Sequence, residues 1–197
     1  MLANLNTMEI ITKEQVKLVA PSVFTKTGSK TVSDKYSHIP TERVMDDMAA
    51  LGWSVVDAKE IKARKNQGFQ KHMLIFANPE IVIEGKDGDT VFPRILLTNS
   101  HDGKNAFSFQ AGLFRLVCSN GLTVPTALSE SFNLRHSRFD LDEVKRLTES
   151  FAGRLPKIET SVQRMMEREL STDEKIDFLR KSAEVRFGKD KVLKEME

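Results

Sequence analysis

Cysteine, long apolar runs and net charge are all scarce in this 197-residue chain. No stretch comes near the roughly 20 apolar residues of a membrane-spanning helix, so we expect no contact with a membrane. The N-terminus lacks the basic start and the apolar run of a signal peptide. The single cysteine, Cys118, cannot form an internal disulfide and fits a reducing compartment. Together these absences predict a cytoplasmic protein.

The common motifs for catalysis and cofactor binding are also missing. The sequence contains no GxxxxGK[ST] phosphate loop, no GxGxxG turn and no HExxH helix. The chain has four histidines: His38, His72, His101 and His136. Their spacing matches no zinc-binding pattern, so we expect neither a metal nor a cofactor. The remaining enzymatic hypothesis is a metal-dependent nuclease, with His101, Asp102 and His136 as its catalytic residues.

Composition indicates a folded protein with a weak preference for acidic partners. Hydrophobic residues make up 40% of the chain and charged residues 29%, and the net charge is +2. These values are typical of a globular domain and exclude a disordered chain. Residues 53–139 hold eleven basic and eight acidic side chains, so the positive excess lies in the middle of the sequence. This charge permits binding to nucleic acid without requiring it.

Two short helices are predicted before residue 53. Thr12 and Gln15 have the spacing of a capping box that opens the first helix. Residues 25–35 are polar and rich in turn-forming residues, which predicts a loop. Thr41 is expected to cap the second helix, which Gly52 ends in the C′ position.

From Trp53 to Gln110 the hydrophobic pattern has a period of two, which is typical of strands. Residues 53–64 and 69–76 are predicted to form a hairpin, and residues 81–83, 91–97 and 106–110 to add strands. Pro93 favours an edge or a strand entry. The pattern predicts an antiparallel β-meander of four or five strands. Residues 112–119 then resemble a short helix, in which Cys118 lies near the C-terminal end, and residues 122–124 and 132–135 resemble short strands.

Residues 140–197 are predicted to form a helical tail behind an α+β core of residues 1–139. Apolar residues recur at alternating intervals of three and four over residues 141–165, and Pro156 predicts a kink or a break. A second capping box at Ser171 and Glu174 opens another helix, which Gly188 ends. The seam over residues 141–165 either packs on the sheet or joins two copies into a homo-oligomer.

Basic residues gather in the first hairpin. They are Lys59, Lys62, Arg64, Lys65 and Lys71, with Phe69 among them. Such an arm can follow a phosphate backbone while an aromatic ring stacks on a base. Arg115 and Arg135 are further candidate contacts. The alternative is that the lysines keep an edge strand from pairing with other molecules.

The segment Asn99 to Gly103 reads Asn-Ser-His-Asp-Gly and has two interpretations. Asn, Ser and Asp side chains bond to nearby backbone and Gly adopts positive φ, so the segment predicts a tight connection between strands. The alternative is a polar loop that presents Ser100 and His101 to a ligand.

Several segments resemble one family closely. They are Tyr36 to Pro40, Leu51-Gly52-Trp53, Lys71 to Phe76, Leu97 to Gly103, Gly112 to Leu122 and Arg135-His136. Over roughly residues 36–165 the chain is similar to the phage/plasmid-like protein family, catalogued as domain of unknown function 932. The resemblance implies a source in mobile genetic elements and implies no activity. Because relatives are often found near recombination and single-strand-binding genes, it favours a role on DNA.

These observations lead to a first hypothesis and two alternatives. We expect a nucleic-acid-binding accessory protein of a phage, prophage or plasmid, which binds or anneals single-stranded DNA in recombination or replication. The first alternative is a protein-binding module, such as an inhibitor of host defence or an oligomerising adaptor, with a host or phage protein as its partner. The second alternative is the nuclease described above.

Overall fold

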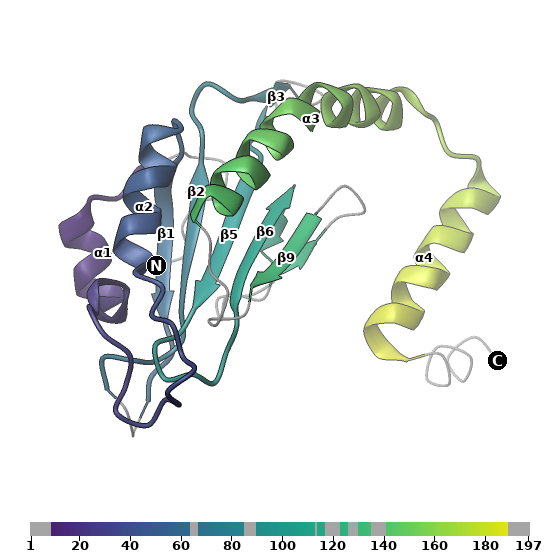
Figure 1. The fold of residues 1–197 in the computed structure, drawn as a ribbon. Helices are drawn as coiled ribbons and strands as arrows, with labels where there is room; N and C mark the ends of the chain where they lie inside the picture. Colours follow the sequence, from purple (N-terminus) through teal and green to yellow (C-terminus); the bar gives the residue numbers. More distant parts are fainter. Residues whose placement is uncertain are drawn as a thin grey trace. The chain divides into compact units, whose positions relative to one another are not determined.

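The computed structural model describes residues 9–63, 67–84, 90–112, 114–116, 123–125, 130–134 and 141–188. Three short helices come first: α1 (Lys13–Val19), the 3-10 helix η1 (Pro21–Phe24) and α2 (Thr41–Ala50). The strands are β1 (Ser54–Glu60), β2 (His72–Ala77), β3 (Ile83–Glu84), β4 (Thr90–Val91), β5 (Arg94–Asn99), β6 (Phe107–Gly112), β7 (Phe114–Leu116), β8 (Thr123–Pro125) and β9 (Glu130–Leu134). Helices α3 (Leu141–Glu167) and α4 (Thr172–Phe187) follow them (Figure 1).

The main sheet has the strand order β1-β2-β5-β6-β9, and each neighbouring pair is antiparallel. The predicted α+β fold with an antiparallel meander is therefore confirmed. Two small hairpins interrupt the meander: β3 pairs with β4 between β2 and β5, and β7 pairs with β8 between β6 and β9. Pro93 separates β4 from β5, because proline lacks the N–H that a continuous strand would use.

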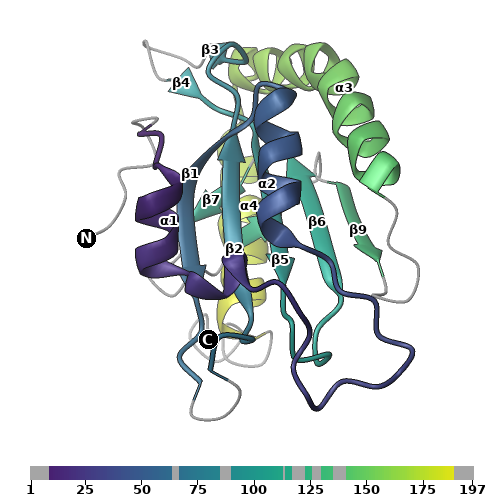
Figure 2. The same ribbon diagram turned by 60° about the vertical axis from the view of Figure 1, so that its left-hand side comes forward.

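One face of the sheet forms the core beneath α2 and the first part of α3 (Figure 2). Alternate residues of the central strands point to this face and are buried, among them Leu74, Phe76, Ile95, Leu97 and Phe109. From α3, the ring of Phe151 lies against Trp53, with ring centroids 6.1 Å apart. The Thr148 hydroxyl meets the Met48 sulfur of α2 at 3.5 Å. The two helices thus share one apolar layer with the sheet.

Helix ends follow the sequence at four of the five predicted positions, among them Gly188, which ends α4 with φ of 88°. Both capping boxes are present, Thr12 with Gln15 and Ser171 with Glu174. Gly52, with φ of 83°, follows Leu51, the C-cap of α2, and so takes the expected C′ position. The predicted cap at Thr41 is wrong, because Pro40 takes the N-cap position and Thr41 is the first helical residue. The Thr41 hydroxyl instead bonds to side chains of the sheet.

The predicted short helix at residues 112–119 is wrong where the structure describes it. Gly112 ends β6, and Phe114–Leu116 pairs with Thr123–Pro125 as strand β7. The apolar spacing that resembled a helix face is too short to outweigh pairing with a second strand. Cys118 lies outside the described residues. Strand β1 also ends earlier than expected, at Glu60.

Helix α3 continues through Pro156, so of the two predicted alternatives, a kink or a break, the break is wrong. Four apolar seam positions, Val144, Phe151, Leu155 and Ile158, are buried. The chain divides into compact units at residues 1–159 and 160–197, so this part of the tail belongs with the sheet, beyond the boundary we expected at residue 140. None of the described helices combines the length and apolarity needed to cross a bilayer.

Candidate nucleic-acid interface

Three segments that are distant in sequence meet where β2 begins and β5 ends (Figures 1 and 2). We call the described residues of 25–36, 61–71 and 100–106 the loop end. The His101 N–H donates to the Phe69 carbonyl at 2.9 Å, and the His101 carbonyl accepts from the Ser29 N–H at 2.8 Å. The Thr25 hydroxyl donates to the Gly68 carbonyl. These bonds join all three segments into one surface.

The loop end is basic. It carries six lysines against the two acids Asp34 and Asp102. The lysines are Lys26, Lys30, Lys35, Lys62, Lys71 and Lys104, and all but the half-buried Lys71 are exposed. Two of them have acidic partners: Lys26 pairs with Glu42, and the Lys104 Nζ lies 4.0 Å from Asp102 Oδ2. Folding therefore gathers positive charge that the sequence spreads over about eighty residues.

The structure brings only some of the predicted contacts to this surface. Lys62 and Lys71 belong to the loop end, and Phe69 is half-buried there. Lys59 lies within β1, where its Nζ is 3.6 Å from the Asp57 carboxylate. Arg115 lies in β7. Four other candidates lie outside the described residues, namely Arg64, Lys65, Arg135 and His136.

Sequence reasoning missed Lys26, Lys30, Lys35 and Lys104. The first three lie in the polar segment that was correctly expected to be a loop. Their spacing of four and five residues was a signal, but nothing local indicated that this loop lies beside the β1–β2 hairpin. The missing information was a set of long-range hydrogen bonds.

Beneath the loop end, three histidine rings pack together. The ring centroids of His72 and His101 are 5.1 Å apart, and those of His38 and His101 are 4.5 Å apart. His72 and His101 are fully buried. Over the described part of the chain, no group of three or more histidine, cysteine, aspartate or glutamate residues is placed to hold a metal ion. The nuclease candidates His101 and Asp102 are thus adjacent, but His101 has no access to solvent.

His72 is held by hydroxyl groups on both ring nitrogens. Its Nδ1 lies 2.8 Å from Ser22 Oγ, and its Nε2 lies 2.9 Å from Thr41 Oγ1. Because the Gln70 carbonyl 3.2 Å from Nδ1 can only accept, the ring proton is assigned to Nδ1, and the Thr41 hydroxyl then donates to Nε2. Burial lowers the pKa of His72 from 6.5 to about 4, although the bond to the Gln70 carbonyl opposes this shift. The ring is therefore neutral at physiological pH.

The Asn-Ser-His-Asp-Gly segment forms the expected tight connection. The Ser100 hydroxyl and the Lys104 N–H both donate to Asp102 Oδ1, at 2.9 and 3.1 Å. Gly103 has φ of +74°, which a side chain would disfavour. The same bonds orient residues 102–106 outward. The connection is therefore structural and also forms part of an open surface.

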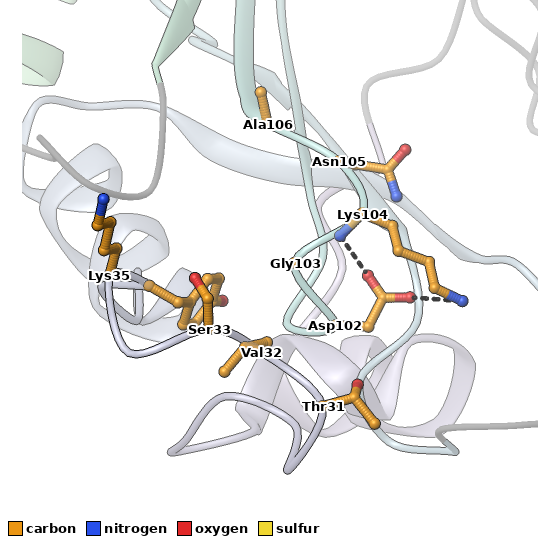
Figure 3. A pocket seen from close by; sticks show the side chains of 10 residues that line it. Thr31, Val32, Ser33, Lys35, Asp102, Gly103, Lys104, Asn105 and Ala106 are labelled. Carbon is orange, nitrogen blue, oxygen red and sulfur yellow. Dashed lines mark hydrogen bonds and ion pairs between the residues drawn. The ribbon is translucent and has the colours of Figure 1, made fainter.

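A cavity of about 450 Å³ opens between residues 31–36 and 102–106 (Figure 3). Its lining is mostly polar and includes Thr31, Ser33, Tyr36 and Asn105, with Lys35 and Lys104 coming from the two opposite loops. Burial, and secondarily the charge of Asp102, raise the pKa of Tyr36 to about 12. The phenol thus stays neutral, and it donates to the Ser100 carbonyl at 3.4 Å.

Comparisons with known proteins agree with the resemblance described above. The family model "Domain of unknown function (DUF932)" matches residues 29–196. Two Escherichia coli K12 proteins are similar over 122 residues: UPF0380 protein YfjQ at 32% identity and UPF0380 protein YafZ at 33%. Each match covers 61% of this chain and 43% of the relative, so the chain spans less than half the length of these proteins. No solved structure matches.

Proposed function

The chain belongs to the DUF932 family, and we propose that it binds single-stranded nucleic acid through the loop end, as an accessory protein of a phage, prophage or plasmid. One observation carries the proposal. Hydrogen bonds hold three separate loops side by side, and these loops together expose five lysines. Binding to a phosphate backbone needs clustered positive charge more than a high overall charge. The net charge of +2 is therefore no obstacle.

The shape of the loop end favours a single strand over a duplex. The surface is made of three irregular segments, so it offers no regular helix or ribbon for the major groove. Half-buried rings lie among the lysines, namely Phe69 and Tyr36. Proteins that bind single strands combine such aromatic rings with a basic path for the backbone. Annealing or protecting strands during recombination or replication is a role that this surface would serve.

The test is fluorescence anisotropy with a labelled single-stranded oligonucleotide, measured over a range of salt concentrations. The double variant Lys30→Glu/Lys62→Glu removes two exposed lysines from the loop end. The control, Lys17→Glu/Lys175→Glu, makes the same change in net charge on exposed surfaces of α1 and α4. We expect about tenfold weaker binding for the first variant and a slope of log K against log salt reduced by about 0.7 per lost contact.

The control variant should bind like the unaltered protein. Equal binding by both variants would show that the loop end does not contact the strand. Equal losses in both would mean that only overall charge matters. Either result removes the proposed interface.

A protein-binding role is the second candidate, and exposed apolar residues on α4 favour it. Ile176 and Leu179 are 55% and 66% exposed, and with Ala183 they lie on one side of the helix. The occupant that we propose is a second copy of this helix, because the spacing of these residues is that of a coiled-coil seam. Assembly through residues 141–165 is less favoured, since most apolar seam positions there are buried against the sheet.

Light scattering on the full chain tests this second role. Leu179→Glu should convert a dimer to a monomer. Val185→Glu is the matched control, because Val185 is 90% exposed on the opposite side of α4. A monomer in all three proteins would end the idea of assembly through α4.

A further inference from the structure

We propose that the cavity between residues 31–36 and 102–106 holds one nucleotide of the bound strand, with the base against Tyr36 and the phosphate at the rim beside Lys35. This inference rests on the proposed function and deepens it, because it assigns a ligand unit to one part of the loop end.

The size of the cavity fits this ligand. Its volume of about 450 Å³ lies within the range of roughly 300–1,000 Å³ that is usual for small-molecule sites. A single nucleotide fits such a space, whereas a base pair within a stacked duplex does not. A base can enter only if it has left its stack, which favours an unpaired strand.

The chemistry of the lining has the two parts that a nucleotide needs. Lys35 and Lys104 line opposite sides of the cavity, and Lys104 points to Asp102, so over the described residues Lys35 is the lysine of the lining that has no acidic partner (Figure 3). Within the cavity, the Tyr36 ring supplies an aromatic wall. Ser33 adds an exposed hydroxyl, whereas Thr31 Oγ1 lies 2.9 Å from Ser29 Oγ and the Asn105 Nδ2 donates to Ser100 Oγ, which leaves the remaining hydrogen-bonding capacity of these groups for a base.

Asp102 contributes negative charge to the lining, and its carboxylate is bonded within its own loop. Asp102 accepts from the Ser100 hydroxyl and the Lys104 N–H, and its side chain is only 12% exposed. Its carboxylate is therefore occupied within the loop. The Lys104 Nζ lies 4.0 Å from Asp102 Oδ2, so Lys104 offsets the negative charge of this carboxylate and Lys35 is left to meet the phosphate.

Two glycines keep the cavity walls in place before any ligand arrives. A Cβ on Gly28 would lie 2.7 Å from the Tyr36 ring, and a Cβ on Gly103 would lie 3.2 Å from Val32. The ring and Val32 thus pack directly on backbone that carries no side chain. The bond from the Ser29 N–H to the His101 carbonyl ties the two loops together. A preformed site costs less ordering when it binds.

The test uses ¹H–¹⁵N correlation spectra of the full chain titrated with dTMP, with thymidine and inorganic phosphate as separate probes. We expect dTMP to shift resonances of residues 31–36 and 102–106. Each partial probe should bind at least about tenfold more weakly, because stacking and phosphate contacts each contribute on that scale. Shifts confined to other residues, or equal binding of phosphate and dTMP, would overturn the proposal.

Three variants test the site further. Ala106→Trp fills the cavity from an exposed lining position, and Thr27→Trp places the same ring at an exposed position outside the lining. The first should abolish the dTMP shifts, weaken oligonucleotide binding about tenfold and reduce the salt slope by about 0.7, because one phosphate contact is lost with the nucleotide. The second should change neither. Lys35→Gln leaves the cavity open and should weaken dTMP while thymidine binding stays the same.

The two proposals fail in different ways. If the oligonucleotide binds with a steep salt slope and Ala106→Trp takes up dTMP as before, the nucleotide subsite is wrong and the basic surface stands. If dTMP enters the cavity and no oligonucleotide binds, the strand-binding function is wrong and the nucleotide site stands.

Discussion

His72 and Asn99 lie directly opposite each other on β2 and β5, and both side chains reach the same hydroxyl group. The Asn99 Nδ2 donates to Thr41 Oγ1 at 2.9 Å, and Thr41 Oγ1 donates to His72 Nε2 at 2.9 Å. The first residue of α2 is thereby fixed to two strands at the edge of the loop end. All three side chains are buried, so the network orients the loops and does not contact a ligand.

The first prediction concerns pH. His72 has a pKa of about 4 in the folded protein against 6.5 when unfolded, so between these values the unfolded chain binds more protons. Its contribution to stability is fully present above pH 6.5 and is lost as pH falls toward 4. The shift corresponds to about 3 kcal/mol. Denaturation at a series of pH values should show this slope, and His72→Gln should flatten it. An equal slope in both proteins would assign the effect to other groups.

Removing the shared hydroxyl should be costly. Thr41→Val keeps the shape of the side chain but takes a partner from both His72 and Asn99 in a buried site. We expect a loss of about 2–3 kcal/mol in the free energy of unfolding, because two buried polar groups lose a bond. Thr12→Ala is the control, since it removes an exposed helix cap worth about 1 kcal/mol. Urea unfolding measures both, and a smaller loss for Thr41→Val would mean that the network contributes little.

Alanine substitutions at two glycines would distinguish the energetic cost of backbone strain from the cost of a steric clash. Gly68 and Gly103 both have positive φ, at 86° and 74°. A Cβ at Gly68 meets nothing within 4 Å, whereas one at Gly103 lies 3.2 Å from Val32. Alanine at Gly68 should therefore cost about 1 kcal/mol from strain alone, and alanine at Gly103 should cost more. Thermal unfolding compares the two. An equal loss of stability in both variants would show that the Val32 side chain moves aside at no energetic cost.

The packing of α3 on the sheet can be followed through the only tryptophan. Trp53 is 2% exposed and its ring lies 6.1 Å from that of Phe151. Phe151→Ala should cost about 3–5 kcal/mol and shift the Trp53 emission to longer wavelength. Met165→Ala is the control on the same helix, because Met165 is 65% exposed. It should leave both stability and emission nearly unchanged. An unaltered emission spectrum in Phe151→Ala would argue against this packing.

Local patterns in the sequence were sufficient to predict most helices and strands of the fold. The alternation of apolar and polar residues from Trp53 to Gln110 predicted the meander, because successive side chains of a strand point to opposite faces of the sheet. The capping boxes at Thr12 and Ser171 needed only residues three positions away. Where a distant partner competed, local patterns failed. Thr41 had the identity of a cap, but two strands took its hydroxyl, and residues 114–116 paired with residues 123–125 instead of forming a helix.

By itself, the sequence determined most of the helices, strands and loops of this protein, since these depend on neighbours within a few residues; strand β7 depends on a partner strand and is the exception. Tertiary structure alone decided that Lys30, Lys62 and Lys104 lie on one surface, and that residues 31–36 and 102–106 enclose a cavity. The reason is that hydrogen bonds such as Ser29 to His101 join positions some seventy residues apart. No periodicity or composition encodes such a contact, because it forms only when the sheet brings its connecting loops together.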